Sequence, residues 1–255
     1  MVNEYLGKTI DIHCGGKDLS FPHHENEIAQ SEAANGVPFA NYWMHNGYIN
    51  IDNRKMSKSL GNFFTVRDLA EKFPYDVLRF FMLSAHYRSP INFSDDLLEQ
   101  AKTGLNRIVT CIKNLEFLTD KVANESIAED KEAALAAHRQ KFIDAMDDDL
   151  NTAEAIGVIF ELVRDINTET KENAAKGYVD AAYALLKELT GVLNIARVEE
   201  DSDVDVAQIE DLIAQRTAAK KEKNFQKADE IRAELLAMGS VIEDTREGVK
   251  WHKAD

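Results

Sequence analysis

The spacing of apolar residues predicts that the middle of the chain is helical. Between about residues 95 and 193, apolar side chains recur at steps of three and four, which places them on one face of an amphipathic helix. Because short polar segments join these helices, we expect an antiparallel bundle. Three stripes carry the prediction: Leu98, Ala101, Leu105, Ile108, Ile112 and Leu115; Leu150, Ala153, Gly157, Phe160 and Val163; and Val179, Ala182, Leu186, Leu189 and Leu193.

The first fifty residues mix strand-like and helix-like segments. Residues 8–13 are predicted to form a short strand that ends in a turn at Gly15 and Gly16. Pro22 is placed to open a helix that stops near residue 36, and residues 42–51 are strand-like around a glycine. This alternation indicates an α/β arrangement.

A polar segment follows this α/β region. Residues 52–62 show no hydrophobic periodicity and are predicted to form a loop. Thr65 and Asp68 have the spacing of a capping box that opens a short helix.

The last fifty residues are predicted to form a small unit of their own. An acidic linker at 199–205 precedes two helices at about 207–221 and 225–238. Strand-like residues 240–244 and 249–251 then surround a turn, which predicts a β-hairpin.

Charge is concentrated in the middle of the chain. The 255 residues include 45 acidic and 30 basic side chains, a net charge of −15. Residues 120–215 carry 23 acidic and 9 basic residues, whereas 216–255 carry 8 acidic and 9 basic residues. A nucleic-acid partner is therefore expected to use the ends of the chain or one selected face, because phosphates are repelled by the acidic segment.

Composition is that of a globular protein. Hydrophobic residues make up 44% of the chain and charged residues 29%, which excludes a disordered chain. No apolar run is long enough to span a membrane, and the first residues do not resemble a secretion signal. Two cysteines cannot form a disulfide framework. We therefore expect a cytoplasmic protein without membrane contact.

Two groups of residues suggest chemistry at the N-terminal end. His23 and Glu27 lie four residues apart on the predicted helix, so they share a face, and their nitrogen and oxygen atoms suit Zn²⁺. A zinc site needs three or four ligands, so the pair alone is more often a solvated helix face. Gly15 and Gly16 after a strand would let the backbone approach a nucleotide while Asp18 accepts from ribose hydroxyls, although such a sequence is often only a turn.

The polar loop carries the stronger signal. Lys55-Met-Ser-Lys-Ser59 presents two lysines, Lys55 and Lys58, and two hydroxyls, Ser57 and Ser59. These groups suit the negative charge that builds on a triphosphate when pyrophosphate leaves. A generic charged loop is the alternative, but this pentapeptide is improbable by chance.

Together these motifs resemble the cysteinyl-tRNA synthetase (cysteine–tRNA ligase) family of class I. The resemblance runs from residue 1 to about 253 in the family's own order. It is carried by Asp11–Gln30 with its Phe-Pro-His-His-Glu-Asn-Glu motif, Tyr42–His45, Lys55–Asn62, His86–Arg88 and Met146–Asp149 followed by Asn151-Thr152.

The resemblance implies roles for individual residues. His23 and Glu27 match two zinc ligands, Lys58 matches the second lysine of the ATP-contacting loop, and Asp18 matches the acidic residue facing the adenosine ribose. The histidines that match pocket-lining positions are His13 and His24. The zinc takes the substrate thiolate directly, which would reject serine because a hydroxyl is a far poorer ligand.

The chain also departs from the family's pattern. The family's His-Ile-Gly-His motif has no counterpart, and its two zinc-ligating cysteines precede the position that matches Met1. Cys14 is a candidate substitute ligand but is expected to belong to a turn, and Cys111 is expected to be a packed thiol. We therefore expect a C-terminal portion of the enzyme that lacks the N-terminal half of the catalytic domain and is inactive alone.

Two further motifs lie between the loop and the tail. Asp147, Asp148 and Asp149 suggest a Ca²⁺ or Mg²⁺ site, but they precede a helix that starts at Asn151-Thr152, where carboxylates favour the helix dipole, so capping is the expected role. The resemblance places Arg88 in the segment that links the catalytic core to the helical domain, on the side of the tRNA stem.

The tail is predicted to bind tRNA. Five basic residues, Arg216, Lys220, Lys221, Lys223 and Lys227, suit phosphates. Asp229 and Asp244 are expected to accept hydrogen bonds from base edges, and Phe225 or Trp251 to stack on a base. The alternative is that the lysines only solubilise a small helical hairpin.

These observations predict four parts. An incomplete Rossmann-like α/β catalytic domain with the lysine loop (1–65) is followed by a connecting segment (66–120), a helical tRNA-binding bundle (121–198) and a small C-terminal α+β anticodon-binding unit (206–255). The expected protein is a monomer that uses tRNA(Cys), cysteine and ATP with Mg²⁺. The alternatives are a non-catalytic tRNA-binding fragment and the related cysteine ligase of mycothiol synthesis.

Overall fold

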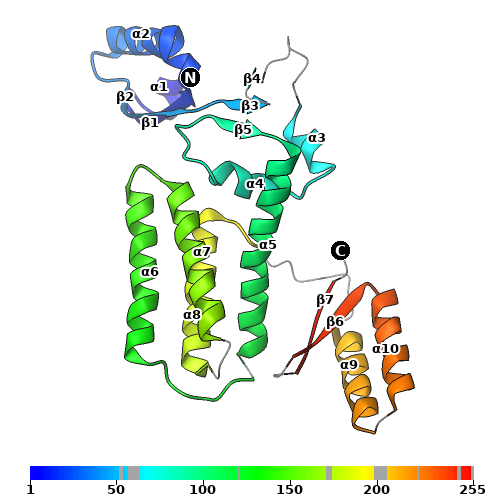
Figure 1. Cartoon of the computed structure of the whole chain (residues 1–255). Coiled ribbons are helices and arrows are strands. Elements are labelled where there is room, and N and C mark those ends of the chain that lie inside the picture. The colour runs from blue at the N-terminus through cyan, green and yellow to red at the C-terminus, as the bar shows by residue number, and fades with distance from the viewer. Residues whose placement is uncertain are drawn as a thin grey trace.

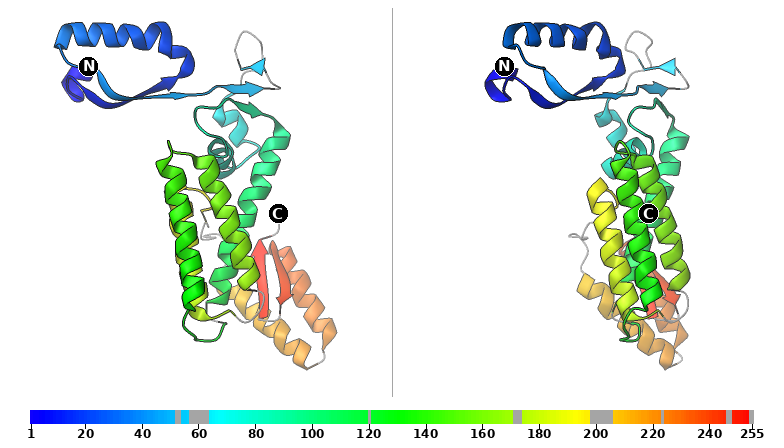
Figure 2. Two further views of the ribbon diagram at one scale, coloured as in Figure 1. Left: turned by 60° about the vertical axis from the view of Figure 1, so that its left-hand side comes forward. Right: turned by 90° about the vertical axis from the view of Figure 1, so that its left-hand side faces the viewer.

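The computed structural model describes residues 1–51, 54–56, 64–119, 121–170, 174–197, 206–222, 224–245 and 248–253. An N-terminal strand–helix–strand piece lies at one end of a helical bundle, and the C-terminal unit lies beside the half of the bundle farther from it (Figures 1 and 2). The α/β-then-helical fold class is confirmed.

The N-terminal piece is a parallel strand–helix–strand unit. Strand β1 (Ile10–Gly16) pairs with β2 (Ala40–Asn46) in parallel, and helix α2 (Glu25–Asn35) makes the crossover. Three short helical elements, α1 (Val2–Tyr5), η1 (Lys17–Leu19) and η2 (Ser20–His24), flank β1 and α2. The prediction of a turn at Gly15 and Gly16 is wrong, because both residues continue β1 and pair with β2.

A second small sheet joins the N-terminal piece to the helices. Strand β3 (Ile49–Ile51) lies between β4 (Arg54–Lys55), to which it is antiparallel, and β5 (Ile91–Phe93), to which it is parallel. The loop prediction is therefore wrong for residues 54–55, because their backbone pairs with β3, while residues 52–53 and 57–63 lie outside the described residues.

Two short helices connect this sheet to the bundle. Helix α3 (Val66–Ala70) starts with the predicted capping box of Thr65 and Asp68, which is confirmed. Helix α4 (Tyr75–Leu83) follows after residues 71–74 and buries three of its apolar side chains.

The bundle consists of α5 (Asp95–Leu118), α6 (Glu129–Asp147), α7 (Thr152–Glu169) and α8 (Lys176–Leu193). The predicted stripes of α5 and α8 are buried, so both are confirmed. The stripe predicted for α7 is only partly right: Val163 is buried and Phe160 packs against the core, but Leu150 is 47% exposed and Gly157 is exposed. Because α7 contacts α4, α5, α6 and α8, a wider face is buried, comprising Ala155, Ile156, Val158, Ile159, Leu162, Val163 and Ile166.

One hydrophobic core runs from Phe73 to Ala196 and includes α4 and all four bundle helices. The connecting segment and the bundle, predicted as separate parts divided at residue 120, therefore pack as one body. No described helix is both long and apolar enough to cross a membrane.

The C-terminal unit has its own core. Helices α9 (Val206–Lys221) and α10 (Phe225–Ala237) pack on the hairpin of β6 (Ser240–Thr245) and β7 (Gly248–Lys253), as predicted. Its buried apolar side chains are Ile209, Leu212, Ile231, Leu235 and Ile242.

Candidate functional site

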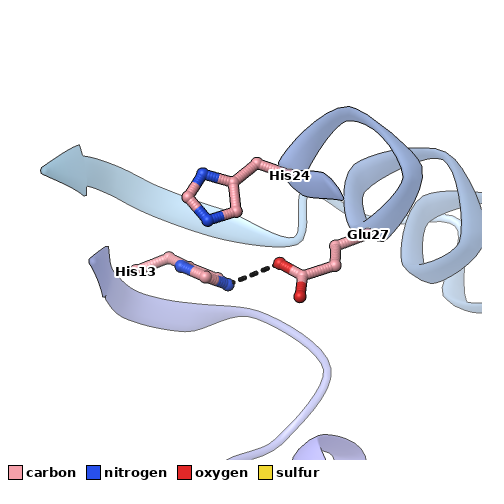
Figure 3. A group of neighbouring side chains, drawn as sticks. All are labelled: His13, His24 and Glu27. Atoms are coloured by element: carbon pink, nitrogen blue, oxygen red, sulfur yellow. Dashed lines mark ion pairs between the residues drawn. The ribbon is translucent and has the colours of Figure 1, made fainter. Parts of the chain in front are cut away.

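A cluster of histidines lies where β1, β2 and the start of α2 meet. The parallel register places His13 of β1 beside Trp43 of β2, and Gly15 beside His45. His24 ends η2 and points toward His13, and Glu27 reaches the same place from the first turn of α2 (Figure 3).

The side chains of the cluster contact one another directly. The His13 ring stacks on Trp43 with centroids 4.5 Å apart. His13 Nε2 lies 2.7 Å from Glu27 Oε2, and His24 Nδ1 lies 2.9 Å from His45 Nε2. The stacking and both polar contacts hold the rings in fixed orientations.

His24 is the buried member of the cluster, with 4% of its surface exposed. Burial, followed by the nearby His13, lowers the pKa of His24, so the ring is neutral at neutral pH. A Cβ at Gly15 would lie 2.7 Å from His24 Cε1 and 2.8 Å from Nε2. A glycine is therefore needed at position 15 because the ring occupies the space of a side chain.

Three residues of the cluster offer ligand atoms for a metal ion. One atom each from His13, His24 and Glu27 lie within 4.8 Å of one another. Two imidazole nitrogens and one carboxylate oxygen form a donor set that zinc uses in open sites, so these residues fit the ion. Of the predicted pair, Glu27 belongs to this group, whereas His23 is exposed and does not.

A cavity of about 610 Å³ adjoins the cluster between α1, β1 and α2. Its lining includes His13, Glu27, Phe39 and the exposed thiol of Cys14. The volume is within the range of small-molecule sites. Cys14 lines this cavity but is not part of the metal-ligand group.

The residues predicted to contact a nucleotide lie partly outside the described structure. Asp18 is exposed in η1, directly after β1, and a Cβ at Gly16 would lie 2.6 Å from Asp18 Oδ1. Ser57, Lys58 and Ser59 are outside the described residues, and Lys55 is described only as backbone of β4.

Three family models match successive parts of the chain: the tRNA synthetases class I (C) catalytic domain at 1–103, the DALR domain at 141–197 and the cysteinyl-tRNA ligase anticodon binding domain at 206–251. The cysteine–tRNA ligase of Lachnospira eligens is 54% identical over 257 aligned residues, which cover all of this chain and 54% of the relative. That of Clostridioides difficile is 56% identical and covers 99% of this chain and 55% of the relative. The chain belongs to the cysteine–tRNA ligase family.

The chain spans about half the length of these curated relatives. Two solved structures share its fold. The LeuRS of Agrobacterium radiobacter K84, solved with tRNA and LeuAMS, matches 70% of this chain and 25% of its own with a TM-score of 0.56 at 22% identity. The Mycobacterium tuberculosis methionyl-tRNA synthetase, solved with methionyl-adenylate, matches 73% of this chain and 40% of its own with a TM-score of 0.54 at 20% identity.

In this member of the ligase family, Arg88 is held by the bundle. Arg88 Nη2 donates to Asp149 Oδ1 at 3.2 Å, Arg88 Nε donates to Oδ2, and Tyr87 Oη donates to Oδ1 at 2.8 Å. The hydrogen bond from Arg88 lowers the pKa of Asp149 most, and the hydrogen bond from Tyr87 lowers it further. The Tyr87 carbonyl accepts from the N–H of Gly47, which lies between β2 and β3, so the segment that contains Arg88 contacts both this N-terminal connection and the bundle.

The capping role expected of Asp149 is wrong. Asn151 caps α7 by accepting from the Glu154 N–H, while Asp149 faces Arg88. Asp149 has a φ of 56° and Leu150 a φ of 55°, which redirect the chain between α6 and α7. Sequence spacing gave no signal for this pairing, since the two residues are 61 positions apart.

The anticodon-binding match covers a unit built around a buried arginine. Arg216 is 4% exposed and donates two hydrogen bonds to Asp244, at 2.8 and 2.9 Å, while Lys220 Nζ lies 2.7 Å from the same carboxylate. Arg216 and Asp244 are therefore structural partners, and Lys220 is already paired. Asp229 is exposed and Phe225 is 63% exposed, whereas Trp251 packs on the small core.

The two cysteines differ in environment. Cys111 is 1% exposed within α5, and burial raises the pKa of its thiol to about 12. The prediction that Cys111 is a packed thiol is confirmed. Cys14 is exposed on β1.

Proposed function

We propose that this chain supplies part of the cysteine-activating site and the tRNA-binding regions of a cysteine–tRNA ligase. The proposed reaction joins cysteine to ATP to give cysteinyl-adenylate and pyrophosphate, and then transfers the cysteinyl group to tRNA(Cys). The observation that carries the proposal is the convergence of His13, His24 and Glu27 beside a cavity of about 610 Å³. Ligands commonly bind at the carboxyl ends of parallel strands, where this cluster lies.

We propose that the site holds zinc with Glu27 as one ligand. Bound zinc would take the thiolate of the substrate cysteine as a ligand. The histidine ligands that accompany Glu27 have two candidate assignments. The family resemblance favours His23, and the geometry favours His13 with His24. Because His13 Nε2 contacts Glu27 in this structure, His13 would orient the carboxylate if His23 is the histidine ligand.

The other substrates are assigned by motif. We propose that Lys55, Ser57, Lys58 and Ser59 contact the phosphates of ATP with its Mg²⁺, and that Asp18 accepts from the ribose. We further propose that the bundle and the C-terminal unit bind tRNA(Cys), with Lys221, Lys227, Asp229 and Phe225 as the exposed contacts of the tail. A translation enzyme of this kind would act in the cytoplasm.

The first test concerns zinc. We expect this 255-residue chain to bind Zn²⁺ weakly, with a dissociation constant above about 1 μM. The cluster offers only three ligand residues, and two of them, His13 and Glu27, already contact each other. Glu27→Gln should remove the remaining binding. Isothermal titration with zinc, and metal analysis of the purified chain, make the measurement.

Glu25→Gln is the matched control, since Glu25 is an exposed carboxylate on the same helix and outside the ligand group. His23→Ala and His24→Ala assign the histidine ligand. Tight stoichiometric zinc in the purified chain would contradict the expected weak binding, and full binding by Glu27→Gln would remove Glu27 from the site.

The second test concerns tRNA. We expect the chain to bind a tRNA(Cys) transcript and deletion of 206–255 to weaken binding by about tenfold or more, because the tail offers exposed cations and an aromatic ring. Fluorescence anisotropy with labelled tRNA measures both affinities.

A tRNA with a different anticodon is the control for specificity. Equal affinity before and after the deletion would show that the tail is structural. No binding of tRNA by the intact chain would contradict the tRNA proposal and favour the mycothiol-type ligase.

A further inference from the structure

Three segments that are far apart in the sequence meet where the N-terminal piece continues into the rest of the chain. They are the β2–β3 connection at residues 47–48, the α4–β5 connection at 84–90 and the α6–α7 corner at 148–151. We call these three segments the joint. The N-terminal piece carries the histidine cluster and lies at one end of the molecule (Figures 1 and 2). The joint therefore lies between the candidate site and the bundle.

The first contact of the joint is backbone against backbone. The Gly47 N–H donates to the Tyr87 carbonyl at 2.7 Å. A Cβ at position 47 would lie 2.3 Å from the carbonyl oxygen of Ser89 and 2.7 Å from the nitrogen of Pro90. Because no side chain fits at such distances, only glycine allows the two connections to meet. The end of the N-terminal piece is therefore tied to the position of the α4–β5 connection.

The second contact ties the α4–β5 connection to the bundle. Arg88 and Tyr87 both donate hydrogen bonds to the Asp149 carboxylate. The Thr152 hydroxyl, at the start of α7, also donates to the Leu83 carbonyl at 2.8 Å. The α6–α7 corner thus holds the α4–β5 connection at two places, and through it the residue that follows β2.

The corner that carries Asp149 has an unusual backbone conformation. Asp149 and Leu150 are consecutive residues with φ values of 56° and 55°, a region that residues other than glycine, asparagine and aspartate rarely adopt. Burial of Leu150 does not explain this conformation, because its side chain is 47% exposed. The conformation instead directs the Asp149 carboxylate at Arg88. Residues held in such regions are concentrated at functional positions, which points to a role for this contact.

We propose that Asp149 is a positioning residue, which fixes the joint through Tyr87 and Arg88 and so fixes the N-terminal piece relative to the bundle. The inference rests on the proposed function. There, adenylate formation needs the catalytic domain, whereas in the transfer step a hydroxyl of the bundle-bound tRNA must reach the cysteinyl carbonyl and displace AMP. Because a misplacement of about 1 Å can cost about 100-fold in rate, the transfer step depends on the joint.

The placement can be measured directly in the 255-residue chain. Cys14 is exposed and Cys111 is buried, so a thiol-reactive spin label attaches at Cys14, and Ala137→Cys adds a second label at an exposed position of α6. Pulsed electron paramagnetic resonance then gives the distribution of distances between the labels. We expect one narrow distribution in this parent and a broader or displaced one after Asp149→Asn. Asparagine removes the charge but keeps the side-chain shape and tolerates the positive φ.

Asp144→Asn is the matched control. It removes the same charge from an exposed carboxylate earlier on α6, which accepts from Gln140 of the same helix. Its distance distribution should match that of the parent. Arg88→Gln removes the contact from the other side and should reproduce the change caused by Asp149→Asn. The double variant should be no more altered than either single variant, because all three lose the same contact.

Circular dichroism of every variant checks that the fold is kept. An unchanged distribution in both Asp149→Asn and Arg88→Gln would overturn the proposal. So would changes that add in the double variant, or an equal change in Asp144→Asn, since the effect would then be one of net charge.

The effect on the reaction is measured in a cysteine–tRNA ligase of the relatives' full length that contains this sequence. After Asp149→Asn, we expect cysteine-dependent pyrophosphate exchange to stay within about twofold and kcat for tRNA charging to fall about tenfold to hundredfold. A purely structural role would lower both rates together, because unfolded enzyme contributes to neither. An equal loss in both rates would therefore overturn the positioning role.

The remaining outcomes separate this inference from the proposed function. A changed label distance with unchanged tRNA charging would overturn the positioning role and leave the proposed function standing. Absence of both exchange and charging in the unmodified full-length enzyme would overturn the proposed function, and with it the role of the joint in transfer.

Discussion

Replacing Lys58 with alanine, in a cysteine–tRNA ligase of the relatives' full length that contains this sequence, is expected to slow cysteine activation by about 10²–10³-fold. This is the usual effect of losing one group that stabilises charge in the transition state. Cysteine-dependent exchange of pyrophosphate into ATP measures the rate. Because Lys58 is proposed to act as pyrophosphate leaves, kcat should fall more than KM rises.

Lys72→Ala is the control for Lys58, since Lys72 is an exposed lysine shortly after α3 and outside the motif. Its rate should match that of the unmodified enzyme. An unchanged rate for Lys58→Ala would remove Lys58 from the mechanism.

Asp244→Asn is expected to destabilise the C-terminal unit by about 2 kcal/mol. This is less than the ~3–5 kcal/mol for breaking a fully buried pair, because the Asp244 side chain is half exposed. The substitution keeps the shape of the side chain but leaves the Arg216 guanidinium, with a side chain only 5% exposed, without its anion. Hydrogen exchange of the amides of α9 and β6 in the whole chain reports the free energy of opening this unit.

The same pair sets the acid response of the tail. Hydrogen bonds from Arg216 and then Lys220 hold the pKa of Asp244 far below its usual value of 3.8. Since the folded pKa lies below the unfolded one, the pair contributes its full stability above about pH 5 and loses it progressively as the pH falls. Asp244→Asn should therefore flatten the dependence of opening on pH below about 5.

Glu234→Gln on the exposed face of α10 is the matched control and should change the opening free energy by less than about 0.5 kcal/mol. Protection of α9 that is equal in Asp244→Asn and the unmodified chain would show that Arg216 finds another anion. It would also return Asp244 to the set of candidate RNA contacts.

Local rules determined much of the fold. The stripes of α5 and α8, the capping box of Thr65 and the C-terminal hairpin depend on residues a few positions apart, so periodicity and capping chemistry predicted them. The stripe of α7 was partly misplaced because this helix is apolar over more than one face. Only its contacts with four other helices decided which face is buried.

Motifs in the sequence also determined the family and the candidate chemistry of Glu27, His13 and His24. Tertiary structure decided which of these side chains meet: the parallel register of β1 and β2 stacks His13 on Trp43, and the path of η2 turns His24 inward while His23 stays exposed. Two pairings, Arg88 with Asp149 and Arg216 with Asp244, join residues 61 and 28 positions apart. No rule of local spacing reaches that far, because such contacts exist only once the helices and strands have packed.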